Sequence, residues 1–180
     1  MSNSGWTSTS MPYLAPRTTG ESDAWTAEAK AMGRRGGQRI LEAKQEPATP
    51  EVAALLGLTE GQPVAIRRRL IELDGQPCEL TDTHYPADIA AGTPLADTAK
   101  IPGGAVTLLA ALGYVGVRVT ETVSARMPSP EECGQLRLSE AEPVLRLSRV
   151  TYDATDRAIQ ADVMIVPATR QQLRYEIKIG

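Results

Sequence analysis

Three consecutive arginines, Arg67, Arg68 and Arg69, are the residues of this 180-residue chain best suited to hold an anion. A guanidinium group is always charged and pairs with carboxylates and phosphates through two parallel hydrogen bonds. On a strand Arg67 and Arg69 would share one face, and Arg69 could reach an anionic ligand from it. Two other interpretations stay open: a solvated strand face with cross-strand partners such as Glu79, or a structural ion pair that is repeated at Arg149.

Hydroxyl groups follow the arginines on the next stretch of chain. Thr81, Thr83 and Tyr85 alternate, so on a strand they share a face. They could line a cavity with hydroxyls, or they could stand on an exposed face, because Thr and Tyr are good strand formers. His84 points to the opposite face, and as the single histidine of the chain it is interpreted as structural rather than catalytic.

A pair of glycines, Gly103 and Gly104, opens an apolar stretch that ends at Gly113. Free N–H groups at the start of a helix attract anions. No Lys-Ser/Thr pair completes a phosphate-binding loop, however, and the glycine spacing is not that of a dinucleotide fold. A simple turn is therefore favoured, although Thr107 in the first helical turn could still donate to a ligand.

The remaining reactive side chains exclude several kinds of site. Cys78 and Cys133 form neither a disulfide framework nor a zinc-ligand spacing, and one histidine leaves too few nitrogen ligands for a usual zinc site. No Ser-His-Asp or Cys-His set is present, and no pair of carboxylates is marked by its spacing. We therefore expect a protein that is not an enzyme and that uses no metal or other cofactor.

Charge and hydropathy narrow the classes of protein further. The net charge of −3 and the pI near 5.3 lack the basic footprint of a domain that binds DNA by itself. No apolar run approaches the roughly 20 residues that span a bilayer, and no secretory signal is visible. The sequence predicts a cytoplasmic protein without membrane contact.

An internal repeat supplies the elements that would position these residues. Residues 49–70 recur as residues 129–150, so that Pro50 returns as Pro130, an offset of 80 residues. The other shared positions are Glu51, Leu56, Leu58, Glu60, Pro63, Val64 and Arg69 in the first copy, and Glu131, Leu136, Leu138, Glu140, Pro143, Val144 and Arg149 in the second.

Each copy is typical of a strand, a short helix and a hairpin. Thr49 and Ser129 are good N-caps, and proline is favoured at the first helical position that follows them. The segment Asp74-Gly75 is a strong two-residue hairpin turn. The further expected elements are strands over 38–45, 117–126 and 173–179, a helix over 103–113 and a second hairpin that turns at 153–156.

This pattern predicts an α+β fold with a largely antiparallel sheet and short helices. Two such units paired about a pseudo-twofold axis could bury their shared sheet and enclose a cleft for a ligand. Residues 1–22, rich in Ser, Thr, Gly and Pro, are expected to form a flexible or loosely packed segment that packs locally through Trp6 and Tyr13. A short helix over 23–32 would begin the domain proper, which we place at 23–180.

The chain resembles the effector-binding UTRA domain of the HutC subfamily of GntR-type transcription regulators. The resemblance rests on TPEVAALLGLTEGQPV, RRRLIELDGQP followed by THYPADIA, VTLLAALGY, and SPEECGQLRLSEAEPVLRLSRVTYD, in this order and spacing. It implies a chorismate-lyase-like fold and a homodimer. It also implies that DNA is bound only by a winged helix-turn-helix, which these 180 residues do not contain.

The resemblance also suggests site residues. Relatives that sense sugar phosphates carry two arginines around one strand residue, and here Arg69 matches the first whereas Ile71 replaces the second. Gln160 stands where many relatives have a glutamate, and Tyr175 is a counterpart of a C-terminal tyrosine. These departures favour a less charged or more apolar ligand. The predicted ligand-binding residues are Arg69, Thr81, Thr83, Thr107, Gln160 and Tyr175.

Taken together, these features predict a small-molecule sensor whose ligand changes the placement of DNA-binding heads. Two alternatives differ in class: an enzyme on the chorismate-lyase-like fold, and a stand-alone protein that associates with a full-length regulator.

Overall fold

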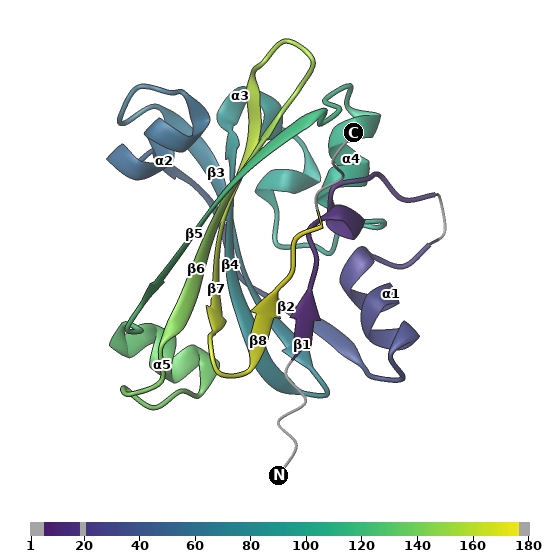
Figure 1. Ribbon diagram of the computed structural model, residues 1–180. Helices are drawn as coiled ribbons and strands as arrows, with labels where there is room; N and C mark the ends of the chain where they lie inside the picture. Colours follow the sequence, from purple (N-terminus) through teal and green to yellow (C-terminus); the bar gives the residue numbers. More distant parts are fainter. Residues whose placement is uncertain (1–5, 19–20, 177–180) are drawn as a thin grey trace.

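A six-stranded antiparallel sheet in the order β2-β3-β4-β7-β6-β5 forms the centre of the molecule (Figure 1). The computed structural model describes residues 6–18 and 21–176. The predicted α+β class with a largely antiparallel sheet is confirmed. The strands of this sheet are β2 (Gly36–Pro47), β3 (Pro63–Leu73), β4 (Gln76–Pro86), β5 (Arg118–Arg126), β6 (Val144–Tyr152) and β7 (Ala158–Pro167).

Two short helices, α2 (Pro50–Leu56) and α5 (Pro130–Leu136), cover one face of the sheet, which we call the outer face (Figure 1). The caps predicted from the repeat are present. The Thr49 hydroxyl accepts from the Val52 N–H at 3.3 Å, and the Ser129 hydroxyl accepts from the Glu132 N–H at 3.2 Å. Helix α2 buries Val52, Ala53 and Leu56, and helix α5 buries Leu136, each in a cluster with outward side chains of the sheet.

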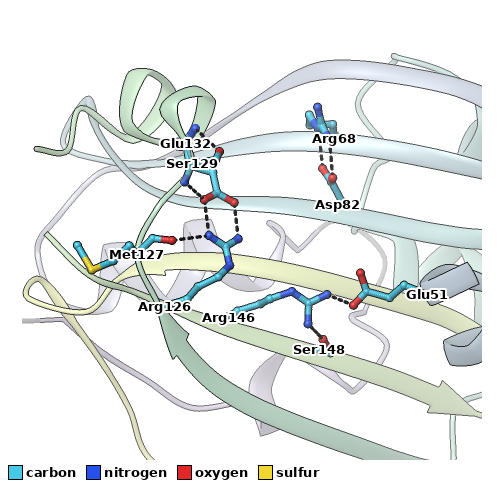
Figure 2. Close-up of polar contacts among 9 residues, drawn as sticks. All are labelled: Glu51, Arg68, Asp82, Arg126, Met127, Ser129, Glu132, Arg146 and Ser148. Atoms are coloured by element: carbon cyan, nitrogen blue, oxygen red, sulfur yellow. Dashed lines mark hydrogen bonds and ion pairs between the residues drawn. The ribbon is translucent and has the colours of Figure 1, made fainter. Parts of the chain in front are cut away.

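The two copies of the repeat are interlocked on the outer face. Helix α2 of the first copy packs on β7 of the second, and α5 packs on β4 of the first. Glu51 at the start of α2 accepts a hydrogen bond from Arg146 on β6, as Figure 2 shows. The equivalent Glu131 of α5 accepts from Arg68 on β3 at 3.3 Å. The helix of each repeat copy is therefore fixed by contacts with strands of the other copy.

The opposite, inner face of the sheet is covered by a looser layer of short elements (Figure 1). An apolar cluster joins Tyr85, Ile89 and Leu109 beneath one end of this layer. Arg67 is buried there and donates to the carbonyls of Pro94 and Ala99 at 2.9 and 3.0 Å. The elements of the layer are 3-10 helices η1 (Met11–Tyr13) and η2 (Pro94–Ala96), helices α1 (Ala24–Ala31), α3 (Ala87–Ala90) and α4 (Ala105–Ala111), and strands β1 (Trp6–Ser8) and β8 (Gln171–Leu173).

The two ends of the chain differ from the sequence-based expectation. Strand β1 lies in the segment expected to be loosely packed, and it pairs in parallel with β8. Of the predicted strand over 173–179, Leu173 belongs to β8 (Gln171–Leu173) and residues 174–176 are not in a strand, whereas residues 177–180 lie outside the described residues. After β7 the Arg170 guanidinium binds Glu142 at 2.9 Å. No helix of the described residues is long and apolar enough to cross a membrane.

Candidate functional site

A cavity of about 170 Å³ lies between the inner face of the sheet and the layer that covers it. Its floor comes from β3, β4, β6 and β7, and its walls come from η1, α1, the start of α4 and β8. The hollow that the duplicated architecture predicted is therefore present. An apolar cavity of about 150 Å³ can hold a molecule as large as benzene, so this one has room for a small metabolite.

The floor of the cavity is organised in rows, because strand registers align inward side chains across the sheet. In one row, positively and negatively charged residues alternate, with one threonine between the first two of them. The row beside it begins with polar residues on β3 and β4 and ends with apolar residues on β7 and β6. The first row is Arg67, Thr83, Asp162, Arg149 and Glu121, and the second is Arg69, Thr81, Met164 and Leu147.

Arg69 lines the cavity and is only lightly held. Its Nη2 donates to the Thr83 hydroxyl at 3.0 Å, and among the described residues it forms no ion pair. Because an arginine has five N–H donors, most of its hydrogen-bonding capacity is left for a ligand. The geometry thus favours the pocket interpretation of Arg69 over the solvated strand face.

Arg149, the repeat equivalent of Arg69, has a carboxylate partner. Its Nε donates to Glu121 at 2.6 Å and its Nη2 donates to the Ser10 hydroxyl at 2.9 Å. Burial opposes ionisation of Glu121, but the hydrogen bonds from Ser10 and Arg149 outweigh it and hold the pKa of Glu121 below its ordinary value. The structural ion pair considered for both arginines therefore exists at Arg149 but not at Arg69 in the described structure.

A buried acceptor, Asp162, joins two of the predicted site residues. The Thr83 hydroxyl donates to Asp162 Oδ1 at 2.6 Å, and Gln160 Nε2 donates to Asp162 Oδ2 at 2.7 Å. Thr83 is buried behind the cavity surface, whereas Gln160 and Asp162 line the cavity. Thr83 consequently orients Arg69 from below instead of facing a ligand.

Glu79 lines the cavity next to Thr81, whereas the sequence suggests for it only a cross-strand contact with an arginine on a solvated face. The Thr81 hydroxyl donates to the Glu79 carboxylate. Burial raises the pKa of Glu79, and the positive charges of Arg69 and Arg149 reduce this effect without reversing it. Its position two residues before Thr81 on β4 was the available signal, because that spacing puts both side chains on one face.

Besides Thr83, two further predicted site residues do not line the cavity. Thr107 donates to the Gly103 carbonyl at 2.8 Å and accepts from the Arg17 N–H at 3.0 Å, so its hydroxyl is used within the wall. Tyr175 is 50% exposed, and burial together with a hydrogen bond to Glu121 raises its pKa to about 12. Thr81 and Gln160 do line the cavity, as does Arg69.

The N-terminal segment forms a wall of the cavity that the sequence did not reveal. Ser10 and Tyr13 line the cavity, and the Tyr13 hydroxyl donates to Glu28 of α1. Trp25 lines it as well, and its indole N–H donates to the Glu72 carbonyl at 3.1 Å. The aromatic residue Tyr13 within a polar stretch was the one sequence signal for this contact.

The cavity-lining cysteine and the histidine of the outer face do not support catalysis. Cys78 lines the cavity, but burial raises the pKa of its thiol, which keeps it in the less reactive protonated form. His84 faces the outer side of the sheet, where burial lowers its pKa. Within residues 6–18 and 21–176, no cluster of three His, Cys, Asp or Glu side chains could hold a metal ion.

Comparison with known families matches residues 31–172 to the UTRA domain. The chain belongs to the UTRA domain family. It is 30% identical over 165 residues to an HTH-type transcriptional regulator of Streptomyces coelicolor, covering 89% of this chain and 61% of that protein. It is 31% identical over 138 residues to the HTH-type transcriptional repressor PhnF of Mycolicibacterium smegmatis, covering 76% of this chain and 55% of that repressor.

The solved effector domain of PhnF from Mycobacterium smegmatis has the same fold as this UTRA domain. The TM-score is 0.75 at 24% sequence identity, with 91% of this chain and 98% of that chain covered. The UTRA domain thus spans little more than half the length of the curated regulators it matches. Since its relatives are transcription regulators and their effector domains, effector binding is supported over an enzymatic activity.

Proposed function

We propose that this UTRA domain senses a small molecule in the inner cavity on behalf of a GntR-type regulator of the HutC subfamily. The observation that carries the proposal is Arg69, a cavity-lining arginine without a carboxylate partner among the described residues. Arg69 would hold a polar end of the ligand, while Thr81 and Gln160 would orient it. DNA binding would belong to a winged helix-turn-helix outside these 180 residues.

The N-terminal segment offers a path from the cavity to such a head. Strand β1 pairs with β8, and Ser10 accepts a hydrogen bond from Arg149, so both ends of this segment touch elements that line the cavity. A ligand that prefers one arrangement of this wall would stabilise the matching placement of the head. Only the difference in affinity between the two arrangements can drive the change.

A cytoplasmic homodimer completes the proposal. Strand β5 is an edge of the main sheet, and unpaired strand edges readily associate. Apolar side chains are exposed on and beside it, among them Val117 and Val123 at 63% and 44% exposure. We expect the Val123→Lys variant to elute as a monomer in size-exclusion chromatography with light scattering, and the Thr120→Lys variant of the opposite face to remain dimeric. A dimeric Val123→Lys variant would remove β5 from the interface.

Native mass spectrometry of the protein purified from its host tests the sensing function directly. We expect one small molecule bound per subunit, lost on mild denaturation. Thermal unfolding in the presence of the identified molecule should then show a concentration-dependent rise in the melting temperature. Protein that carries nothing, and whose melting temperature no metabolite of a broad library raises, would overturn the proposal.

A further inference from the structure

Two cavity-lining groups of opposite charge, Arg69 and Glu79, lie on either side of Thr81. Arg69 on β3 is directly opposite Thr81 in the strand register, and Glu79 is two residues before Thr81 on β4. Diagonal neighbours of this kind are about 7 Å apart on one sheet face. Among the described residues, the hydrogen bonds of their side chains go to threonines, Thr83 for Arg69 and Thr81 for Glu79. They therefore present a positive and a negative group side by side to the same small space.

The other charged side chains that line the cavity have protein partners. Arg17 lies 3.8 Å from Glu21, although its buried Nε has no hydrogen-bond partner among the described residues. Arg149 is paired with Glu121 at 2.6 Å, and Asp162 accepts hydrogen bonds from a threonine and a glutamine. Asp23 caps α1 through the Thr26 N–H at 2.9 Å and pairs with a lysine. Arg69 and Glu79 are the neighbouring pair of opposite charge on the sheet floor whose side-chain hydrogen bonds go only to threonines among the described residues.

We propose that the ligand of this cavity is an amino acid, with its carboxylate on the Arg69 guanidinium and its ammonium group on the Glu79 carboxylate. The inference rests on the proposed sensing function and names the chemical class that the site takes. A zwitterion is complementary to both groups at once, whereas a simple acid or a simple amine pairs with only one of them.

The remaining residues that line the cavity determine which side chain the amino acid can have. Met164 and Leu147 continue the row that starts at Arg69, and Val166 and Leu173 lie beside them. The volume of about 170 Å³, only slightly above that of a cavity that holds benzene, restricts the ligand to a small molecule. An apolar side chain of the size of leucine fits this end.

Proton release from Glu79 on ligand binding provides a second test of the site. Burial raises the pKa of Glu79, so the empty cavity favours a protonated carboxyl more than water does. An ammonium group next to it favours the carboxylate, and binding should release part of a proton. Titration calorimetry in buffers of different ionisation enthalpy measures this release.

Isothermal titration of three matched probes tests the proposal. Leucine, 4-methylpentanoate and 3-methylbutylamine share one 3-methylbutyl group and differ in their charged groups. We expect leucine to bind at least tenfold more tightly than either of the other two. If 4-methylpentanoate binds as tightly as leucine, or if none of the twenty amino acids binds, the amino-acid assignment is overturned, whereas the sensing function stands whenever native mass spectrometry finds another bound small molecule.

Matched variants separate the roles of the two residues. Glu79→Gln should abolish the preference for leucine over 4-methylpentanoate while leaving the affinity for 4-methylpentanoate within about twofold. Arg69→Gln should weaken both acids by tenfold or more. The exposed residues Glu60 and Arg35 provide controls, because Glu60→Gln and Arg35→Gln should change neither affinity. A Glu79→Gln variant that keeps the full preference for leucine would contradict the proposal.

Discussion

Arg69 and Arg149 occupy equivalent positions of the two repeats, yet a carboxylate holds only Arg149. Glu121 on β5 is directly opposite Arg149 and binds it at 2.6 Å. On β2 the residue opposite Arg69 is Ile40, and the nearest acid of that strand, Glu42, lies opposite Arg68. An apolar residue therefore stands where Glu121 stands for Arg149, which leaves Arg69 available to a ligand.

Replacement of Arg69 by alanine should therefore affect binding rather than stability. The guanidinium donates one hydrogen bond to Thr83 and has no carboxylate partner among the described residues. We expect the Arg69→Ala variant to bind the molecule identified by native mass spectrometry at least tenfold more weakly, with nearly the wild-type melting temperature. Calorimetry and thermal unfolding measure the two quantities, and an unchanged affinity would remove Arg69 from the site.

Replacement of Arg149 by alanine should instead lower the stability of the fold. The side chains of Arg149 and Glu121 are only 10% and 11% exposed, so the variant would leave a largely buried carboxylate without its partner. Breaking a buried pair in this way costs about 3 kcal/mol. We expect urea unfolding to show a loss of this order, and Arg35→Ala, which changes an exposed arginine, to serve as control. A fully stable Arg149→Ala variant would mean that Glu121 finds another partner.

The sequence predicted the repeat, its caps and its hairpins because each depends on neighbouring residues. Thr49 and Ser129 cap their helices through N–H groups three residues away, and Asp74-Gly75 forms its turn with φ angles of 53° and 77°. The alternation that placed Arg69 and Thr81 on one face is equally local. Elements of this kind could be predicted without knowing the tertiary structure.

The parts that could not be predicted depend on contacts between distant segments. The parallel pairing of β1 with β8 joins residues more than 160 positions apart, and the sequence of either strand alone does not indicate it. The wall made by Tyr13 depends on Glu28 of α1 in the same way. The place of Thr107 in the first turn of a helix predicts a contact with the ligand, but its hydroxyl instead accepts a hydrogen bond from the backbone N–H of Arg17.

The cavity-lining carboxyl of Glu79 should make the protein less stable as the pH rises. Its pKa is raised in the folded state by burial, so its contribution to stability is present below the unfolded value of about 4.5 and is lost as the pH rises through the folded value. Glu79→Gln removes this loss. We expect the variant to gain stability relative to the wild type between pH 4.5 and 7.5 in urea unfolding, and a constant difference would show that Glu79 is solvated.

The buried histidine His84 should have the reverse effect. Burial lowers its pKa, so its contribution to stability is present above the unfolded value of about 6.5 and is lost as the pH falls below it. Its Nδ1 is buried without a hydrogen-bond partner among the described residues. We expect the wild type to lose up to about 1.4 kcal/mol per pH unit below pH 6.5 from this group, and His84→Leu to show a flatter profile.

The ends of helices α2 and α5 allow a paired prediction, because Gly57 and Arg137 are repeat equivalents with left-handed backbones. Their φ angles are 65° and 54°, and this conformation costs a residue with a side chain about 1 kcal/mol more than glycine. No atom would obstruct a side chain at Gly57, so Gly57→Ala isolates the backbone cost. We expect Gly57→Ala to destabilise and Arg137→Gly to stabilise the fold, each by about 1 kcal/mol in urea unfolding. A loss of stability in Arg137→Gly would instead mean that the 3.4 Å contact of the arginine with Gln76 matters more than the backbone.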